Sequence, residues 1–247
     1  MNTSPRAEAE RSEHRSSAGP GRGECFAGYG VMGLPFRSGH YLTLRRFPAN
    51  PFGRPYYSVW HRDPDGVWVF YTYTPTEQSC TRYFDAAIST ASMVDISVTW
   101  TGPSRLAVEV GTVIAWNIEL RPTTATAVMT GAGRLMPPVM WENRAVLAVM
   151  GRAAAPVLRA GRVRLSGTAP NGQWFRANPR LLWSVADSTA VVDGVNVGPP
   201  GPLPMQARLG DFWLPQRGIF AVGEASFEEF DPSRHQAPRP ASRGAKR

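Results

Sequence analysis

Apolar and polar residues alternate through much of the first half of the chain. Ile96, Val98 and Trp100 fall on one side of this alternation, and the polar residues between them fall on the other. The same period of two continues through residues 106–120. Successive side chains of a strand point to opposite faces of a sheet, so this pattern predicts antiparallel strands that bury one face and expose the other.

A β-hairpin is predicted at residues 56–74. Two runs rich in aromatic and β-branched residues flank the sequence Asp63-Pro64-Asp65-Gly66, in which proline and glycine supply the backbone angles of a tight turn. Further strands are expected at residues 41–47, 162–167, 173–176, 181–186, 212–214 and 218–227, with another hairpin at Asp193-Gly194. This many short strands predict a mainly β fold, an antiparallel barrel or sandwich.

One segment departs from this pattern, because residues 136–161 have the period of an amphipathic helix. Its apolar face would carry Val139, Asn143, Val146, Leu147 and Met150. Gly151 and Gly161 are suited to end a first and a second helix. The sequence therefore predicts a helical insertion near 136–161, with an apolar face that covers the β-structure.

The tails differ from the rest of the chain. Residues 25–230 are predicted to form a single β-rich domain, with the alternative of two β-halves (25–122 and 162–230) around a helical segment at 123–161. Residues 1–24 and 231–247 are polar and charged, so we expect a disordered N-terminal tail and a disordered basic C-terminal tail.

Targeting signals are not evident in the sequence. No stretch approaches the ~20 apolar residues of a membrane-spanning helix, and the N-terminal residues lack the apolar centre of a signal peptide. Cys25 and Cys80 form neither a disulfide framework nor a metal-ligand pattern. We therefore expect a cytoplasmic protein.

The glycines at positions 28, 30 and 33 match a dinucleotide-binding fingerprint. That fingerprint needs a strand before it and a helix after it. Here Pro35 and Gly39 follow, and no helical period appears. We expect a glycine-rich loop at the start of the domain and no bound cofactor.

Charge is unevenly distributed along the chain, whose net charge is +8. Residues 134–180 hold eight arginines and one acid, whereas residues 181–230 hold six acids and two arginines. A local basic surface attracts anionic groups. Arg144, Arg152 and Arg159 of the helical segment would give a weak contact with an anionic membrane, and no nucleic-acid partner is expected.

Residues with familiar catalytic chemistry are scarce. Lysine occurs once, as Lys246 in the C-terminal tail, which excludes Schiff-base chemistry and a phosphate-binding lysine from the domain. No serine-hydrolase elbow, H-E-x-x-H or paired C-x-x-C is present, so no metal site is predicted. His61 and Cys80 would be a base and a nucleophile if the fold brings them together. The candidate general acids are Asp85, Glu109, Glu119, Asp187 and Asp211.

Two short motifs suggest a family. Gly66-x-Trp68 and Gly172-x-Trp174 are similar to the Gly-x-Trp signature of lipocalin-like barrels. With the paired hairpins, the chain resembles the tandem lipocalin-like (calycin-type) proteins that include the carotenoid hydratases. The resemblance implies a β-barrel fold and hydrophobic ligand binding. No catalytic residue is carried over from it.

Strands that close on themselves enclose an apolar interior, and eight Trp, eleven Phe and eight Met would supply its walls. We predict that the protein binds an apolar small molecule of lipid, isoprenoid or polyketide type, with an anionic end, inside this barrel-like interior. The candidate ligand-binding residues are Trp60, His61, Trp68, Trp116, Asn143, Trp174, Arg176, Asp211, Trp213 and Arg217. Two alternatives stay open: an enzyme that acts on an isoprenoid or lipid through a buried carboxylate acid, and a peripheral membrane protein.

Overall fold

The structure is a computed structural model, which describes residues 3–14 and 23–238. Its strands are β1 (Glu24–Pro35), β2 (Tyr41–Ala49), β3 (Tyr56–Arg62), β4 (Trp68–Thr72), β5 (Thr90–Met93), β6 (Ile96–Trp100), β7 (Arg105–Val110), β8 (Ile114–Arg121), β9 (Ser166–Thr168), β10 (Trp174–Val192), β11 (Val195–Asn196), β12 (Arg208–Leu209), β13 (Phe212–Trp213) and β14 (Ile219–Phe227). Its helices are α1 (Pro5–Glu13), α2 (Thr81–Phe84), α3 (Thr124–Leu135) and α4 (Arg144–Leu158), with short 3₁₀ turns η1 (Thr76–Gln78), η2 (Asp85–Ala87) and η3 (Pro138–Glu142).

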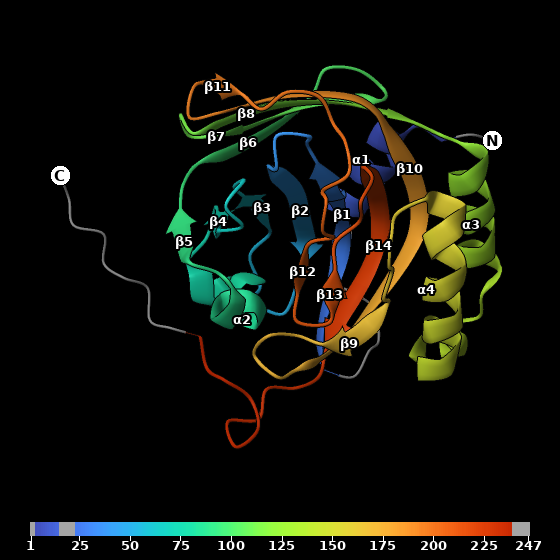
Figure 1. Cartoon of the computed structure of the whole chain (residues 1–247). Coiled ribbons are helices and arrows are strands. Elements are labelled where there is room, and N and C mark those ends of the chain that lie inside the picture. Colours follow the sequence, from blue (N-terminus) through green and yellow to red (C-terminus); the bar gives the residue numbers. More distant parts are fainter. Residues whose placement is uncertain (1–2, 15–22, 239–247) are drawn as a thin grey trace.

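One large sheet dominates the fold, in the order β5-β4-β3-β2-β1-β14-β10-β8-β7-β6. Neighbouring strands along this path are antiparallel except β4 and β5, which are parallel. The two edge strands, β5 and β6, are separated in sequence by only Val94 and Asp95. The opposite edges of the sheet therefore meet, and the sheet curls into a barrel-like shape (Figure 1). The predicted mainly β, antiparallel fold is confirmed.

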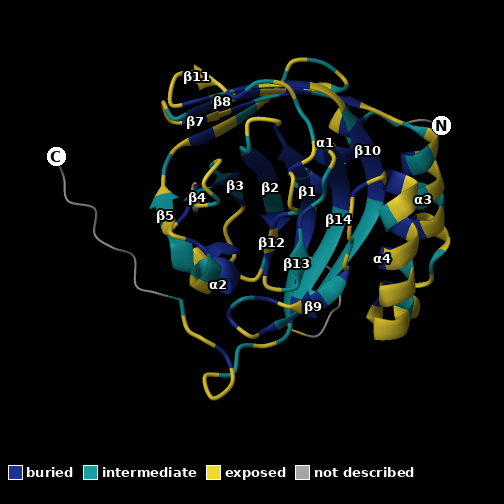
Figure 2. Cartoon of the chain, in the orientation of Figure 1, coloured by how far each residue is buried: buried dark blue, intermediate teal, exposed yellow. Residues whose placement is uncertain are grey.

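The inside of the curled sheet is filled with side chains. A single cluster joins Leu44 and Val59 of one arm of the sheet to Val108 and Trp116 of the other arm. Phe220 of the central strand β14 contacts both Trp100 and Trp183, with ring centroids 5.9 Å apart in each pair. Figure 2 shows β1 and β2 as mostly buried and β7 and β8 as alternately buried and exposed, since only one face of those two strands lies on the interior. The interior is a packed core, whereas we expected it to be the binding cavity.

Further elements cover the opposite face of the central strands. α2 and the β12–β13 hairpin pack there against aromatic side chains of β3 and β4, including Trp60 and Phe70. α3 and α4 lie side by side over β10 and β14, where Ala154 and Leu158 contact Leu182 (Figure 1). The fold is thus a curled sheet with a packed inner face and a covered outer face.

The glycine-rich segment near the N-terminus is a strand, not the loop that we expected. Gly28 and Gly30 lie within β1, which pairs with β2 on one side and β14 on the other. A side chain on either glycine would overlap a carbonyl oxygen of β2, of Arg46 and of Leu44 respectively. Glycine is required here because the backbone of β2 approaches closely.

The helical segment is longer than predicted and divided differently. α3 precedes the segment 136–161 that has the helical period, although it falls within the helical segment 123–161 of the two-halves alternative, and it begins with a capping box between Thr123 and Thr126. Gly151 does not end a helix: it lies within α4, where its missing side chain allows contact with the Val163 carbonyl. Asn143 does not lie on a buried face either. It is exposed, and its side chain caps α4 by accepting hydrogen bonds from the backbone N–H groups of residues 145 and 146.

The two-halves alternative is wrong, because the strands of the two proposed halves interleave in one sheet. β14 pairs with β1, and β10 pairs with β8. β10 is also one long strand, where the sequence analysis expected two. Bulges at Arg180 and Ala186 bend it between the two arms of the sheet.

Part of the N-terminal segment that we expected to be disordered is an ordered helix. α1 is capped by Ser4 and buries Ala9 in the interior cluster. Glu13 accepts hydrogen bonds from Tyr29 at 2.7 Å and from Arg46 at 2.7–3.2 Å. The helix is polar, but one small side chain and one ion pair hold it against the sheet. Residues 231–238 of the expected C-terminal tail are ordered as well: His235 is buried, its Nε2 lies 2.9 Å from Glu228 Oε1, and the Gln236 N–H donates to the Asn171 carbonyl at 2.9 Å. The predicted disorder at residues 1–2, 15–22 and 239–247 lies outside the described residues.

Within the described ranges, no helix has the length and apolarity that crossing a membrane requires.

Candidate functional site

A cavity of about 180 Å³ lies on the outer face of the central strands, between the sheet and the elements that cover it. β14 illustrates how it forms. Phe220 and Val222 point into the filled interior, whereas Ala221 and Gly223 point the other way and line the cavity. Small residues on this face, together with Ala154 on α4, leave space that larger side chains would fill.

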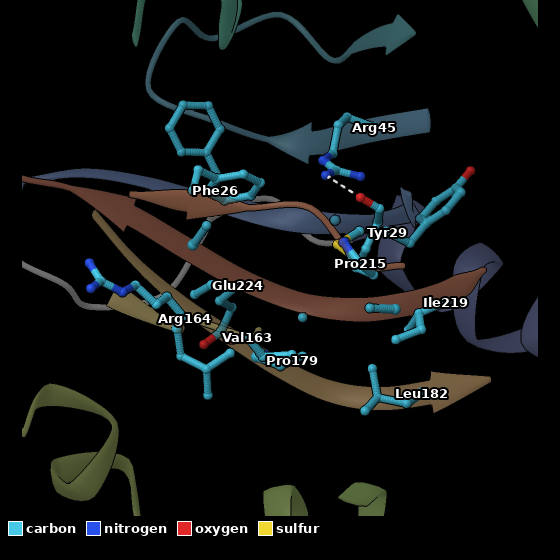
Figure 3. A pocket seen from close by; sticks show the side chains of 18 of the residues that line it. Phe26, Tyr29, Arg45, Val163, Arg164, Pro179, Leu182, Pro215, Ile219 and Glu224 are labelled. Atoms are coloured by element: carbon cyan, nitrogen blue, oxygen red, sulfur yellow. Dashed lines mark hydrogen bonds between the residues drawn. The ribbon is translucent and has the colours of Figure 1, made fainter. Parts of the chain in front are cut away.

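The cavity extends from β2 to the helices. In Figure 3, Phe26 and Arg45 lie at the end towards β2, and Val163 and Leu182 lie at the end towards α3 and α4. Phe84 of α2 and Phe212 of β13 form part of the wall between them. Apart from a few polar groups, the lining side chains are apolar, which is typical of a site for an apolar ligand.

Arg45 is the unusual residue of this cavity, with only 4% of its surface exposed. Its Nη1 donates to the carbonyl oxygens of Val31 (2.6 Å) and Leu44 (3.2 Å), and its Nη2 donates to that of Met32 (3.0 Å). Its guanidinium lies 4.8 Å from the ring centre of Trp60. No carboxylate among the described residues forms an ion pair with it.

The charge of Arg45 persists despite this burial. Desolvation lowers the pKa of its guanidinium to about 10, which leaves it protonated at neutral pH. A guanidinium has five N–H donors, and the three hydrogen bonds to carbonyls leave Nε–H and one Nη2–H for another acceptor. The side chain can therefore hold an anionic group that enters the cavity.

Other polar groups near Arg45 are buried and neutral. The Tyr41 hydroxyl donates to the Pro215 carbonyl at 2.5 Å, and the Tyr56 hydroxyl accepts from the backbone N–H of Cys80 at 2.9 Å. Burial raises the pKa of the Cys80 thiol, which lines the cavity. A protonated thiol is a poor nucleophile, so this cysteine is suited to packing.

Charged pairs border other parts of the cavity. Arg164 pairs with Asp211, which also accepts a hydrogen bond from the backbone N–H of Thr168 at 3.2 Å. Glu224 lines the cavity and lies 3.7 Å from the guanidinium of Arg180. These pairs supply polar groups to a site that is otherwise apolar.

The structure brings only some of the candidate ligand-binding residues to this cavity. Trp60 and Trp213 line it. Trp68 lies in the adjoining aromatic cluster, with its ring centre 5.9 Å from that of Tyr41, and does not line the cavity. Trp116 lies on the other face, in the filled interior.

The remaining candidates lie in separate places. The guanidinium carbon of Arg144 lies 4.0 Å from the ring centre of Trp174. Arg176 donates a hydrogen bond to the Ser226 hydroxyl at 3.3 Å. Asp211 does not line the cavity itself, but it forms an ion pair with Arg164, which does. Arg217 is exposed and lines a second, more polar hollow of about 420 Å³.

His61 and Cys80 do not form a base–nucleophile pair. His61 follows Trp60 along β3 and so points to the opposite face of the strand. Its Nε2 lies 2.9 Å from Nδ1 of His40, and the two rings stack 5.2 Å apart. Desolvation and the neighbouring His40 lower the pKa of His61 to about 4. Cys80 lies with Trp60 on the cavity side.

None of the five candidate general acids lines this cavity, and Asp187 lines the second hollow instead. The carboxylate in the cavity, that of Glu224, was not among the candidates. Arg45 was missed as well. The available signal was the strand period of two, which places Arg45 on the same face of β2 as Tyr41, Thr43 and Phe47. In the part of the chain that the structure describes, no group of three or more His, Cys, Asp or Glu residues is arranged to hold a metal ion.

Comparisons with known proteins give no family. No family model matches the chain, and no curated protein matches it either. A solved structure, the crystal structure of acetoacetate decarboxylase from Legionella pneumophila, aligns over 89% of this chain and 93% of its own, with 9% sequence identity and a TM-score of 0.37. No residue role is transferred from a likeness of this degree.

Proposed function

We propose that the protein binds a small apolar molecule with one anionic group, of lipid, isoprenoid or polyketide type, in the cavity between β14 and α4. One observation carries this proposal: an apolar cavity of about 180 Å³ contains a buried guanidinium, that of Arg45, with no carboxylate partner among the described residues. The proposed site lies on the outer face of the sheet, away from the filled interior.

The size of the cavity limits the ligand. An engineered protein cavity of about 150 Å³ binds benzene, so this one encloses a ring or a branched chain of roughly seven carbons. A longer chain would have to extend beyond it. A ten-carbon isoprenoid acid would place its carboxylate at Arg45 and its apolar chain towards α4, with the end of the chain outside the cavity.

The charge of Arg45 supports an anionic end. A buried charge costs several kcal/mol unless an opposite charge compensates it. Three carbonyl groups and the face of Trp60 compensate Arg45 in part. A ligand carboxylate would accept two parallel hydrogen bonds from Nε–H and Nη2–H, which is the strongest geometry for this pair.

Titration with geranic acid and with geraniol tests the proposal, since the two differ only in the polar group. Trp60 and Trp213 line the cavity, so their emission should report binding. We expect the acid to bind at least about tenfold more tightly, because hydrogen bonds to a charged group contribute ~1.5–3 kcal/mol. Arg45→Met should remove this preference and leave the affinity for geraniol unchanged.

Arg46→Met is the matched control, because Arg46 is the next residue on β2 and pairs with Glu13 on the other face. It should change neither affinity. Absence of saturable binding of both compounds to the wild-type protein would overturn the proposed function.

Glu224 favours a second candidate function, an enzyme that uses a carboxylate acid on the same ligand. It is a carboxylate that lines the cavity. In that case, the wild-type protein would convert a bound isoprenoid acid to a product, and Glu224→Gln would bind the compound without converting it. Unchanged geranic acid after prolonged incubation, in both proteins, is the result expected for a binding protein.

A further inference from the structure

The outward face of the helical layer is unusually apolar for a surface. α3, η3 and α4 turn one side towards the sheet, but their other side carries large exposed apolar residues. These are Val128, Leu135, Val139, Met140, Val149 and Val157, and Leu135 and Val139 are 85% and 71% exposed. We call these six residues, with the arginines of the same segment, the helical face. Figure 2 shows the outer sides of α3 and α4 as exposed.

Positive charge dominates the helical face. Arg134, Arg144, Arg152 and Arg159 are exposed, and none of them forms an ion pair with a described carboxylate. Arg144 lies over the ring of Trp174 and Arg159 lines the second hollow, which leaves Arg134 and Arg152 as the cations of the outward surface. From residue 123 to residue 164 the sequence holds one acid, Glu142. On α4, Arg152 follows Val149 by three residues, so the two side chains share one side of the helix. Cations and apolar groups therefore alternate on a single surface.

We infer that the helical face docks onto an anionic lipid surface. Exposed apolar side chains enter the boundary between headgroups and acyl chains, while neighbouring arginines are attracted by the negative surface. The charge of the face complements that of anionic lipid. A second copy of the same face would instead bring Arg134 and Arg152 against the same arginines of the first copy, which opposes dimerisation.

Nucleic acid fits this face less well. Single strands bind to platforms that combine positive charge with exposed aromatic rings. Trp141, the aromatic residue of this segment, is 1% exposed, so the face offers no ring for stacking. The exposed leucine and valine side chains of this face make no favourable contact with the phosphates of a nucleic acid.

The docking surface and the cavity share one helix. Met150, Ala154 and Leu158 on the inner side of α4 line the cavity, and Val149 and Arg152 lie on the outer side. Only the thickness of α4 separates the lipid surface from the cavity. A protein docked in this way would have its binding site next to a store of apolar molecules.

Cosedimentation of the full chain with vesicles tests this inference. The protein should bind vesicles of phosphatidylcholine and phosphatidylserine, should not bind vesicles of phosphatidylcholine alone, and should dissociate as the salt concentration rises. Replacing Arg134 and Arg152 with Gln should lower the partition coefficient about 25-fold, or about fivefold for each arginine. Replacing Leu135 and Val139 with Ser should lower it about tenfold or more.

Matched variants lie elsewhere on the surface. Arg37→Gln with Arg54→Gln removes two exposed arginines, and Met93→Ser with Val195→Ser removes two exposed apolar residues that are 67% and 68% exposed. Neither pair should change vesicle binding. Binding that survives the helical-face variants, or that falls equally with the control variants, overturns the inference. So does a dimer in sedimentation equilibrium that Leu135→Ser dissociates while vesicles are not bound.

Discussion

The two faces of the central strands differ in how completely they are packed. On β14, Phe220 and Val222 enter an interior cluster that joins both arms of the sheet and leaves little exposed surface. Ala221 and Gly223, on the other face of the same strand, leave an open cavity. Side chains of similar hydrophobic character thus build a core on one face and a ligand-sized space on the other. The difference lies in side-chain volume.

The faces also differ in charge. Beside the interior cluster, the carboxylates of α1 are paired: Glu8 with Arg11, and Glu13 with Arg46. The outer face places the charged Arg45 within apolar surroundings. Arg45 and Arg46 are neighbours on β2, yet only one of them has a carboxylate partner among the described residues. This asymmetry supports the division of roles that we propose, in which the inner face stabilises the fold and the outer face carries the ligand site.

The largest effect on stability is expected from Trp116→Ala. Trp116 is fully buried in the interior cluster and donates a hydrogen bond to the Ser188 hydroxyl at 2.8 Å. Its removal leaves a large cavity and should lower the free energy of unfolding by about 3–5 kcal/mol. Urea denaturation measures this. Tyr73→Ala, at an exposed position, is the control and should cost less than about 0.5 kcal/mol. A small loss for Trp116→Ala would contradict a tightly packed interior.

A somewhat smaller effect is expected from pH, through His61. The pKa of His61 is lowered from its ordinary value of 6.5 to about 4, and the groups that face it are His40, Asp63 and Asp193. The unfolded chain therefore binds this proton more tightly than the folded chain does. The stability contributed by neutral His61 is present above about pH 6.5 and is lost as the pH falls towards 4, on the order of 3 kcal/mol.

Denaturation curves between neutral and acidic pH, for the wild-type protein and His61→Gln, isolate this contribution. The variant should lose less stability on acidification than the wild type. Equal slopes in the two proteins would show that His61 does not titrate with a lowered pKa.

The smallest effects on stability are expected when an alanine on each face of the sheet is replaced by leucine. Ala190→Leu adds bulk to the filled interior, opposite Trp116, and should cost about 1–3 kcal/mol of stability. Ala221→Leu adds the same bulk to the cavity and should cost less than about 1 kcal/mol. The cavity variant should instead weaken geranic acid binding about tenfold or more, since the added methyl groups occupy the ligand's space. Equal destabilisation by the two variants would remove the distinction between the faces.

Much of the strand structure was predictable from the sequence, because a buried face imposes a period of two. The hairpin of β3 and β4 forms at the Asp63–Gly66 turn, and β6 to β8 follow the predicted alternation. Strand order was not predictable. The pairing of β1 with β14 joins residues at opposite ends of the sequence, and no local pattern encodes it.

α1 and α3 lie outside residues 136–161, the segment with a helical period, and they show where local patterns fail. α3 contains several threonines and glycines, which have low helix propensity, and it is held instead by its capping box and by packing on β10. α1 is too polar to be predicted as packed, since the charge of Glu13 is neutralised by Arg46 only in the folded chain. In both cases tertiary contacts outweigh local preference.

The candidate site was predicted only in outline. Tryptophans that line a cavity were expected, and Trp60 and Trp213 do so, but a strand pattern assigned Trp116 equally well to either face. The decisive residue, Arg45, is one of two adjacent arginines on β2. Only the folded structure shows that Glu13, more than thirty residues away, pairs with Arg46 and leaves Arg45 without a carboxylate.

The central claim is that the outer-face cavity binds an apolar acid through Arg45, and a crystal structure of the protein with geranic acid tests it most directly. The account predicts the chain of the acid between β14 and α4, with its carboxylate accepting hydrogen bonds from Nε and Nη2 of Arg45. An acid bound inside the curled sheet, or in the cavity with its carboxylate turned away from Arg45, would contradict it.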